Sequence, residues 1–151
     1  MKSVTEIILR FRLLLLIVAF PVFSQECDMK NEEIQQYLGS YLYDNVKTNQ
    51  LISAGSKYKE EFTLKLFENT LYKFVWVLKE FPREAIINLY SLDKKNNKKL
   101  IYSSIGKKRD KGYLEFLLSN PPNHVVVEYV IPPSSKGCVS LIVGFNLKND
   151  W

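Results

Sequence analysis

Residues 58–79 read YKEEFTLKLFENTLYKFVWVLK and carry the clearest fold signal of the chain. In the first half, Tyr58, Phe62 and Leu64 alternate with polar residues, which is the period-two pattern of a strand with one buried and one wet face. Residues 70–79 are apolar on both faces, which indicates a central strand. Asn69 stands between the halves and predicts a turn. The segment therefore predicts two successive β-strands.

Five further segments repeat the strand pattern, and a weaker one precedes residue 58. They are residues 85–90, 100–103, 113–118, 125–131 and 139–145, with the weaker one at 46–53. Two Pro-Pro pairs separate the last three, because proline cannot donate a hydrogen bond to a sheet. Seven or eight short strands with frequent turn signals predict an all-β antiparallel sandwich or barrel. No long helical pattern intervenes, which argues against a parallel βαβ fold.

One short N-terminal helix is predicted, over residues 28–42. Asp28 is a suitable N-cap, and two acids follow it in the first turns, where the helix dipole favours negative charge. Ile34 and Leu38 are spaced to share one apolar face. Gly39 interrupts this pattern and is a candidate end of the helix.

Residues 1–24 have the order of a secretory signal peptide. Three basic residues and one acid come first, and an apolar run follows at residues 13–23. Val22 and Ser24 then occupy the −3 and −1 positions relative to the expected cleavage site. We expect cleavage between Ser24 and Gln25, which makes the mature protein periplasmic or secreted. The alternative is a retained membrane anchor, but the apolar run is shorter than the about 20 residues that a spanning helix needs. The mature chain is therefore expected to carry no transmembrane anchor.

Cys27 and Cys138 are the only two cysteines of the chain. In an oxidising compartment an even number of cysteines favours a disulfide. This bond would fasten the mature N-terminus to the last predicted strand and close a loop over most of the mature chain. The alternative is two buried thiols that never meet.

Residues 25–151 are interpreted as a single domain. The chain has 151 residues, 46% of them hydrophobic and 25% charged, which suits one folded domain rather than a disordered segment. No Gly-, Ser- or Pro-rich linker separates two apolar clusters. The formal net charge is +5, and +3 without residues 1–24, an excess too small to indicate nucleic acid by itself.

Three groups of segments form a recognisable combination. They are FTLKL at 62–66 with NTLYKF at 69–74, AIINLY at 85–90 with the nearby Asp93, Asn96 and Asn97, and VVVEY at 125–129 with GCVSLIVGF at 137–145. Together they resemble the bacterial pre-peptidase C-terminal family of exported modules. The resemblance spans residues 57–148 and implies an antiparallel β-sandwich of jelly-roll-like topology. Where relatives often carry an acid, this chain has Ala85 and Asn88, so the resemblance implies no calcium or saccharide ligand set here.

His124 is the single histidine of the chain and precedes a predicted strand. A catalytic imidazole needs a nucleophile and an orienting acid, which no spacing around His124 supplies, so an ordinary loop or edge histidine is the simpler interpretation. Glu115 and Glu128 lie on two predicted strands and would form a glycosidase pair if they met on one concave face. Solvated surface positions are the alternative for both glutamates.

Two basic clusters bracket the short strand predicted at residues 100–103. With the neighbouring tyrosines they are candidate sites for an anionic polymer such as nucleic acid or a phosphorylated envelope glycan. Because they stand at opposite ends of one strand, we expect them at opposite rims of the sandwich, and solvated hairpin loops are the simpler interpretation. The candidate anion-binding residues are Lys94, Lys95, Lys98, Lys99, Lys107, Lys108, Arg109 and Lys111. The first four lysines would repel calcium from the oxygens of Asp93, Asn96 and Asn97, so no metal site is expected.

These observations favour an exported, non-catalytic β-sandwich module that acts by binding or by structural contact at the bacterial cell envelope. We expect no cofactor, and an envelope protein or glycan as the partner. No G-x-x-x-x-G-K-[ST] or G-x-G-x-x-G motif occurs, so no nucleotide is expected. Two alternatives remain open: a small carbohydrate-active hydrolase that uses Glu115 and Glu128, and a binder of anionic envelope polymers through the lysine-rich loops.

Overall fold

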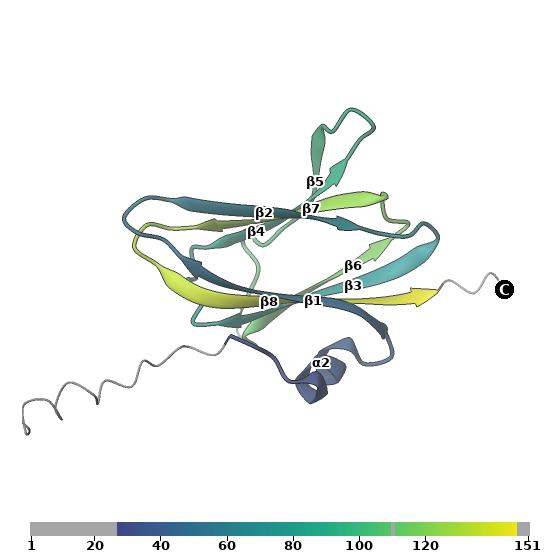
Figure 1. Ribbon diagram of the computed structural model, residues 1–151, viewed down its shortest axis with the longest axis horizontal. Coiled ribbons are helices and arrows are strands. Elements are labelled where there is room, and N and C mark those ends of the chain that lie inside the picture. The colour runs from purple at the N-terminus through teal and green to yellow at the C-terminus, as the bar shows by residue number, and fades with distance from the viewer. Residues whose placement is uncertain (1–26, 110, 148–151) are drawn as a thin grey trace, which may run out of the picture.

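A computed structural model describes residues 27–109 and 111–147, which form a β-sandwich with one short helix on its surface (Figure 1). The strands in these ranges are β1 Leu42–Ile52, β2 Tyr58–Lys65, β3 Thr70–Lys79, β4 Ile86–Leu92, β5 Lys98–Ser103, β6 Tyr113–Ser119, β7 His124–Ile131 and β8 Lys136–Leu147. The expected signal peptide, residues 1–24, lies outside the described residues. In the described part of the chain, no helix has the length and apolar character needed to cross a membrane.

The strands form two antiparallel sheets of four, in the orders β1-β8-β3-β6 and β2-β7-β4-β5. The edge strands β1 and β2 face each other on one side of the sandwich, where Asn49 donates a hydrogen bond to Glu60. The edge strands β5 and β6 face each other on the other side, where the rings of Tyr102 and Phe116 are 4.8 Å apart. This order of eight strands is that of a jelly roll. The predicted all-β antiparallel sandwich is therefore confirmed.

The core between the sheets is rich in aromatic side chains. Trp76 of β3 is fully buried and stacks on Phe74 and Tyr102, with ring centroids 6.0 Å and 5.3 Å away. On β7, Val127 and Tyr129 point into the same core. β3 and β7 each lie between two other strands, and side chains on both of their faces are buried, as the apolar pattern at 70–79 predicts for β3.

The helix α2, Asn31–Leu38, covers the outer face of sheet β1-β8-β3-β6 (Figure 1). Ile34 and Leu38 are buried and pack on Val75, which points outward from β3. Gly144 of β8 allows this close approach, because a Cβ there would lie 2.5 Å from Leu38 Cδ2. The helix thus supplies the second covered face of β3.

The predicted helix boundaries, residues 28–42, are wrong at both ends. Asp28 does not cap the helix; Lys30 occupies the N-cap position and makes no side-chain capping bond. The helix ends before Gly39, which has φ 64° and is the C-cap, as the interrupted pattern suggests. The strand β1 then starts at Leu42 rather than at residue 46, because its pairing with β8 begins there. The backbone hydrogen bonds between β1 and the distant strand β8 outweigh the local helical spacing of the apolar residues.

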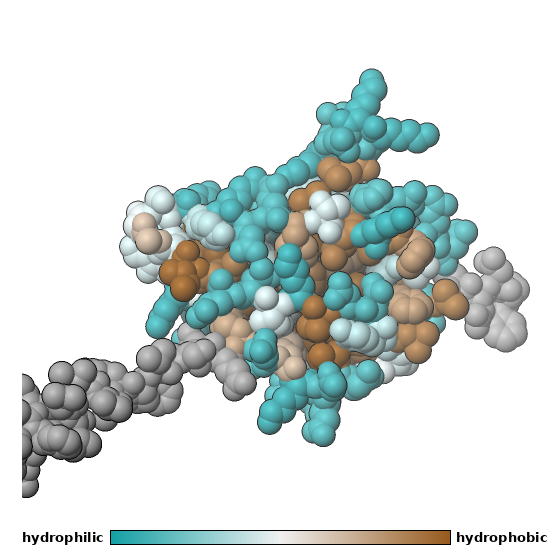
Figure 2. Space-filling model, in the orientation of Figure 1, coloured by the Kyte–Doolittle hydropathy of each residue, from teal (hydrophilic) through white to brown (hydrophobic). Residues whose placement is uncertain are grey.

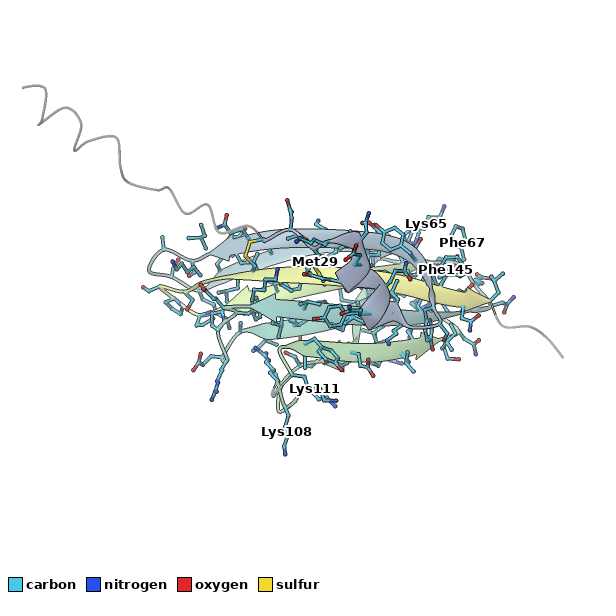
Figure 3. All side chains as sticks on the ribbon, turned by 90° about the horizontal axis from the view of Figure 1, so that it is seen from below. Met29, Lys65, Phe67, Lys108, Lys111 and Phe145 are labelled. Carbon is cyan, nitrogen blue, oxygen red and sulfur yellow. A yellow bond between two sulfur atoms is a disulfide. The ribbon has the colours of Figure 1, made fainter. Side chains whose placement is uncertain are left out.

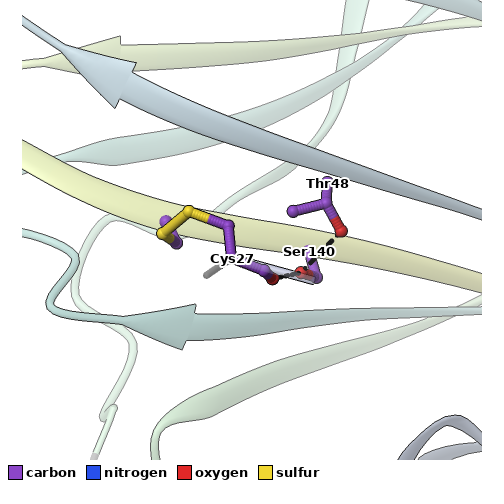
Figure 4. Close-up of a disulfide and its surroundings, with 4 residues drawn as sticks. Cys27, Thr48 and Ser140 are labelled. Carbon is purple, nitrogen blue, oxygen red and sulfur yellow. Dashed lines mark hydrogen bonds between the residues drawn. A yellow bond between two sulfur atoms is a disulfide. The ribbon is translucent and has the colours of Figure 1, made fainter. Parts of the chain in front are cut away.

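Cys27 and Cys138 form a disulfide, which confirms the predicted bond (Figure 4). Their Cα atoms are 5.6 Å apart, and the bond joins residues separated by 111 positions. Beside it, Ser140 donates a hydrogen bond of 3.4 Å to the carbonyl of Cys27, and Thr48 lies within 2.9 Å of the same hydroxyl. The bond therefore fastens the segment before α2 to β8.

Candidate functional site

The two basic clusters lie at opposite ends of β5, as predicted. Lys94 and Lys95 are in the turn of the β4–β5 hairpin, and Lys98 and Lys99 begin β5. This hairpin projects from the sandwich and its tip is hydrophilic (Figures 1 and 2). The second cluster lies in the connection from β5 to β6, which we call the lysine loop and define as residues 104–112, with Asp110 outside the described residues.

The polar groups of the β4–β5 hairpin are used by the hairpin itself. Asp93 Oδ1 accepts hydrogen bonds from the backbone N–H groups of Lys95 and Asn97, at 2.7 Å and 2.8 Å, and Oδ2 accepts one from the Asn97 side chain at 2.8 Å. These bonds, that from the Asn97 side chain first, lower the pKa of Asp93. Lys98 Nζ lies 2.7 Å from Glu61 Oε2. The hairpin turn is therefore held by Asp93, and of the four hairpin lysines Lys98 is paired with Glu61.

Arg109 points into the protein, unlike the lysines of the same loop. Its Nη1 donates to the carbonyl of Pro82 at 2.9 Å, and its Nη2 donates to the carbonyl of Ala85 and to Ser104 Oγ, the latter at 3.1 Å. The guanidinium also lies over the ring of Phe81, 5.8 Å from its centre. Burial lowers the pKa of Arg109. Arg109 thus binds the lysine loop to the β3–β4 connection.

A groove of about 570 Å³ lies between the edge strands β5 and β6, beside the lysine loop. We call it the lysine groove, because three ammonium groups stand around it. Lys108 and Lys111 project from the same side of the molecule (Figure 3). The groove is lined by Lys107, Lys108, Lys111, Tyr102, Tyr113, Glu115 and Phe116, together with neighbouring strand residues.

The aromatic rings of the lysine groove are packed against the protein rather than displayed. Tyr102 is only 9% exposed and lies between Trp76 and Phe116. Burial raises the pKa of Tyr102, so its hydroxyl stays neutral. Tyr113 meets Tyr37 of α2 edge-on, with ring centroids 5.3 Å apart. The groove therefore has an apolar wall and a cationic rim.

A second groove, of about 640 Å³, lies beside the same loop. We call it the arginine groove. Its lining includes Arg83, Glu84, Ile105 and Arg109. Lys107 lines both grooves. Sequence reasoning missed Arg83, because nothing in the sequence places the β3–β4 connection next to the lysine loop.

Glu128 is buried on the outer face of sheet β2-β7-β4-β5. Its neighbours Val127 and Tyr129 point into the core, so Glu128 points away from it. The residue is 4% exposed, and its carboxylate lies 2.5 Å from Lys59 Nζ, 2.8 Å from Asn88 Nδ2 and 3.0 Å from Tyr90 Oη. All three groups donate to it, so the carboxylate is fully engaged by the fold.

Glu115 lies on the other sheet and does not meet Glu128. Leu114 and Phe116 point into the core, so Glu115 points out of β6, with a side chain 53% exposed and 3.5 Å from Lys73. The two carboxylates are on opposite outer faces of the sandwich. A glycosidase pair must flank one bond of one substrate. This pair therefore cannot act as the predicted hydrolase alternative requires.

His124 is exposed at the start of β7, where Lys65 is its partner on β2. It borders a shallow groove of about 470 Å³ near the β4–β5 hairpin. Among residues 27–109 and 111–147, no group of three or more His, Cys, Asp or Glu side chains is placed to hold a metal ion.

Glu61, on the outer face of sheet β2-β7-β4-β5, is held by two ammonium groups. Lys59 Nζ lies 2.7 Å from Oε1 and Lys98 Nζ 2.7 Å from Oε2. These bonds, that from Lys59 first, lower the pKa of Glu61 from 4.5 to about 2. The hydrogen bonds of Lys59 to Glu128 and then to Glu61 raise the pKa of Lys59 above its ordinary value.

We expect a Glu61→Gln variant to lose about 1 kcal/mol of the free energy of unfolding at neutral pH, because solvent screens this partly exposed cluster. The depressed pKa of Glu61 means that its contribution is present above the unfolded-state value of 4.5 and is lost as the pH falls toward 2. Urea unfolding at a series of pH values should show the difference in free energy of unfolding between the wild type and Glu61→Gln disappearing as the pH falls from 4.5 to about 2. A constant difference down to pH 2 would contradict the ion-pair explanation. In a Lys59→Met background, the effect of Glu61→Gln should shrink.

No protein-family model matches this chain, and no curated protein matches it. The resemblance to pre-peptidase C-terminal modules therefore stays a prediction from the sequence. The lysine groove and the arginine groove are assigned from their geometry alone.

Proposed function

We propose that this protein is an exported, non-catalytic binding module of the bacterial cell envelope and that it holds an anionic ligand in the lysine groove. The observation that carries the proposal is the arrangement of the lysine loop. Lys107, Lys108 and Lys111 gather around one groove, while Arg109 between them turns inward and binds the loop to the fold. The signal-peptide pattern of residues 1–24 and the disulfide support the export setting.

The charges around the lysine groove favour an anion. Within the described part of the chain, Lys107, Lys108 and Lys111 form no ion pair, whereas Lys98 of the β4–β5 hairpin is paired with Glu61. Among the described residues, Glu115 is the one acidic side chain that lines the groove, and it lies near Lys73. Unpaired ammonium groups act as point charges that attract phosphate or carboxylate groups. A phosphorylated envelope glycan has this chemistry and is accessible to an exported protein.

We expect the triple variant Lys107→Gln, Lys108→Gln, Lys111→Gln to bind polyphosphate or a phosphorylated glycan at least tenfold more weakly than the wild type. The slope of log affinity against log salt concentration should also become less steep by about 2, because each of the three lost cationic contacts contributes about 0.7 for a single-stranded polyanion. Fluorescence anisotropy with labelled polyphosphate at low and moderate salt measures both quantities.

The matched control neutralises three lysines of the other cluster, with Lys94→Gln, Lys95→Gln and Lys99→Gln. Because these residues lie at the far end of β5, the control should bind within about twofold of the wild type. An equal loss in both triple variants would show that net charge, and not the lysine groove, determines binding. Absence of binding by the wild type at low salt would refute the proposed function.

A further inference from the structure

The lysine loop separates two grooves that share one cation. The lysine groove lies on the β6 side of the loop, and the arginine groove lies on the side of the β3–β4 connection. Lys107 lines both of them. A ligand that passes over the lysine loop at Lys107 therefore leaves one groove and enters the other.

Cations continue from one groove into the other. Lys108 and Lys111 stand at the lysine groove, Lys107 is common to both, and Arg83 is exposed at the arginine groove. In the described residues, no hydrogen bond or ion pair engages the side chain of Arg83 or Lys107. Guanidinium and ammonium groups spread over two adjoining grooves match several regularly repeated negative charges better than a single one.

The loop that separates the grooves is held in place before any ligand binds. Arg109 donates hydrogen bonds to Pro82 and Ala85 on one side and to Ser104 on the other. The backbone N–H of Ser104 also donates to the carbonyl of Ile87 at 2.8 Å. A fixed loop needs little ordering on binding, so ligand segments on both sides of it can be held simultaneously at low entropic cost.

The aromatic rings argue for a polymer recognised by charge. Sequence-tolerant binding of single-stranded nucleic acid uses exposed aromatic faces on which bases stack. Here Tyr102 and Phe116 are packed against each other and Trp76, and the ring of Tyr113 is taken by Tyr37. Among the residues that the structure describes, the grooves therefore offer cations with no free stacking platform.

We propose that the ligand is a linear phosphate-bearing polymer that crosses the lysine loop at Lys107 and occupies both grooves at once. This inference rests on the proposed function, because it requires anion binding in the lysine groove. It adds that Arg83 contacts the same polymer molecule and that the binding affinity depends on the length of the polymer.

The test measures how tightly a short and a long polyphosphate probe bind to the wild type and to an Arg83→Gln variant. Tripolyphosphate is short enough for one groove, and a longer polyphosphate of defined length can span both. For the wild type, we expect the long chain to bind more than tenfold tighter than the short one, since the second groove is then engaged intramolecularly. Arg83→Gln should weaken the long chain about threefold to tenfold and make its salt dependence less steep by about 0.7, while leaving the short probe unchanged.

The variant also separates bridging from a statistical effect. A longer polyphosphate binds more tightly partly because it offers more equivalent positions for binding. The Arg83→Gln variant keeps this gain in affinity but removes the bridging between the two grooves. Lys65→Gln is the charge-matched control, because Lys65 lies away from Lys108 and Lys111 (Figure 3), and it should bind both probes like the wild type. Equal effects of Arg83→Gln and Lys65→Gln on the long chain would overturn the inference.

The outcomes distinguish this inference from the proposed function. If the lysine-groove triple variant loses binding but Arg83→Gln has no length-dependent effect, the lysine groove binds an anion, and the inference that one polymer occupies both grooves is wrong. If the triple variant binds like the wild type, the proposed function fails as well. A single-stranded DNA of equal charge that binds more tightly than polyphosphate would overturn the choice of polymer.

Discussion

Replacing Cys27 and Cys138 with alanine is expected to lower the free energy of unfolding by about 4–5 kcal/mol, which is the effect of removing a crosslink that closes a loop of 111 residues. The loss arises mainly because the unfolded chain regains the freedom that the bond removes. Urea unfolding monitored by tryptophan fluorescence measures it, since Trp76 is fully buried in the folded state. Reduction of the wild type should give the same shift as the double variant. A loss below about 1 kcal/mol would contradict this account.

The disulfide also fixes the position of α2, so part of its effect should be local. A helix of 8 residues is too short to be stable in isolation. It depends on the packing of Ile34 and Leu38 on Val75 and on the anchored segment that begins at Cys27. In the double variant, we expect amide hydrogen exchange to accelerate first in α2. A Ser140→Ala variant, which removes the hydroxyl hydrogen-bonded to Cys27 but keeps the disulfide, should leave the exchange of α2 much closer to that of the wild type.

An Arg109→Gln variant is expected to lose about 2–3 kcal/mol of the free energy of unfolding, because the carbonyls of Pro82 and Ala85 lose a charged hydrogen-bond donor. Arg109→Lys should be intermediate, since one ammonium group cannot reproduce the spread of the guanidinium across three acceptors. Thermal or urea unfolding of both variants tests this. An unchanged stability of Arg109→Gln would show that the hydrogen bonds of the guanidinium do not hold the loop.

The same variant should also weaken ligand binding, although Arg109 is a positioning residue that points away from the lysines. Without its anchor, the lysine loop must be ordered when the ligand binds. Lys108→Gln is the matched control from the same loop, because its side chain is exposed and should change stability by less than about 0.5 kcal/mol. We therefore expect Lys108→Gln to weaken binding alone and Arg109→Gln to weaken both binding and stability. Arg109→Lys should restore part of the affinity together with part of the stability.

The sequence by itself determined the order of the strands along the chain and the class of fold, and it predicted the disulfide. Alternation with period two is a local property, so residues 58–65 and 70–79 show which side chains share a face before any partner strand is known. The turn at Asn69, which has φ 55°, and the end of the helix at Gly39 were predictable for the same reason, because each depends on the backbone preference of one residue. With two cysteines in the whole chain, a disulfide within the chain could join only Cys27 and Cys138, and the structure shows that the two sulfur atoms meet.

Only the tertiary structure decided which strands became edges and which side chains met. The order of strands makes β5 and β6 neighbours across the sandwich, and this creates the lysine groove and places Arg83 beside the lysine loop. It also separates Glu115 from Glu128 and turns Arg109 inward, although Arg109 belongs to a run of lysines in the sequence. Periodicity reveals the two faces of a strand, but contacts between residues far apart in the chain select its neighbours. The candidate site depends on those neighbours, so it could not be assembled from local patterns.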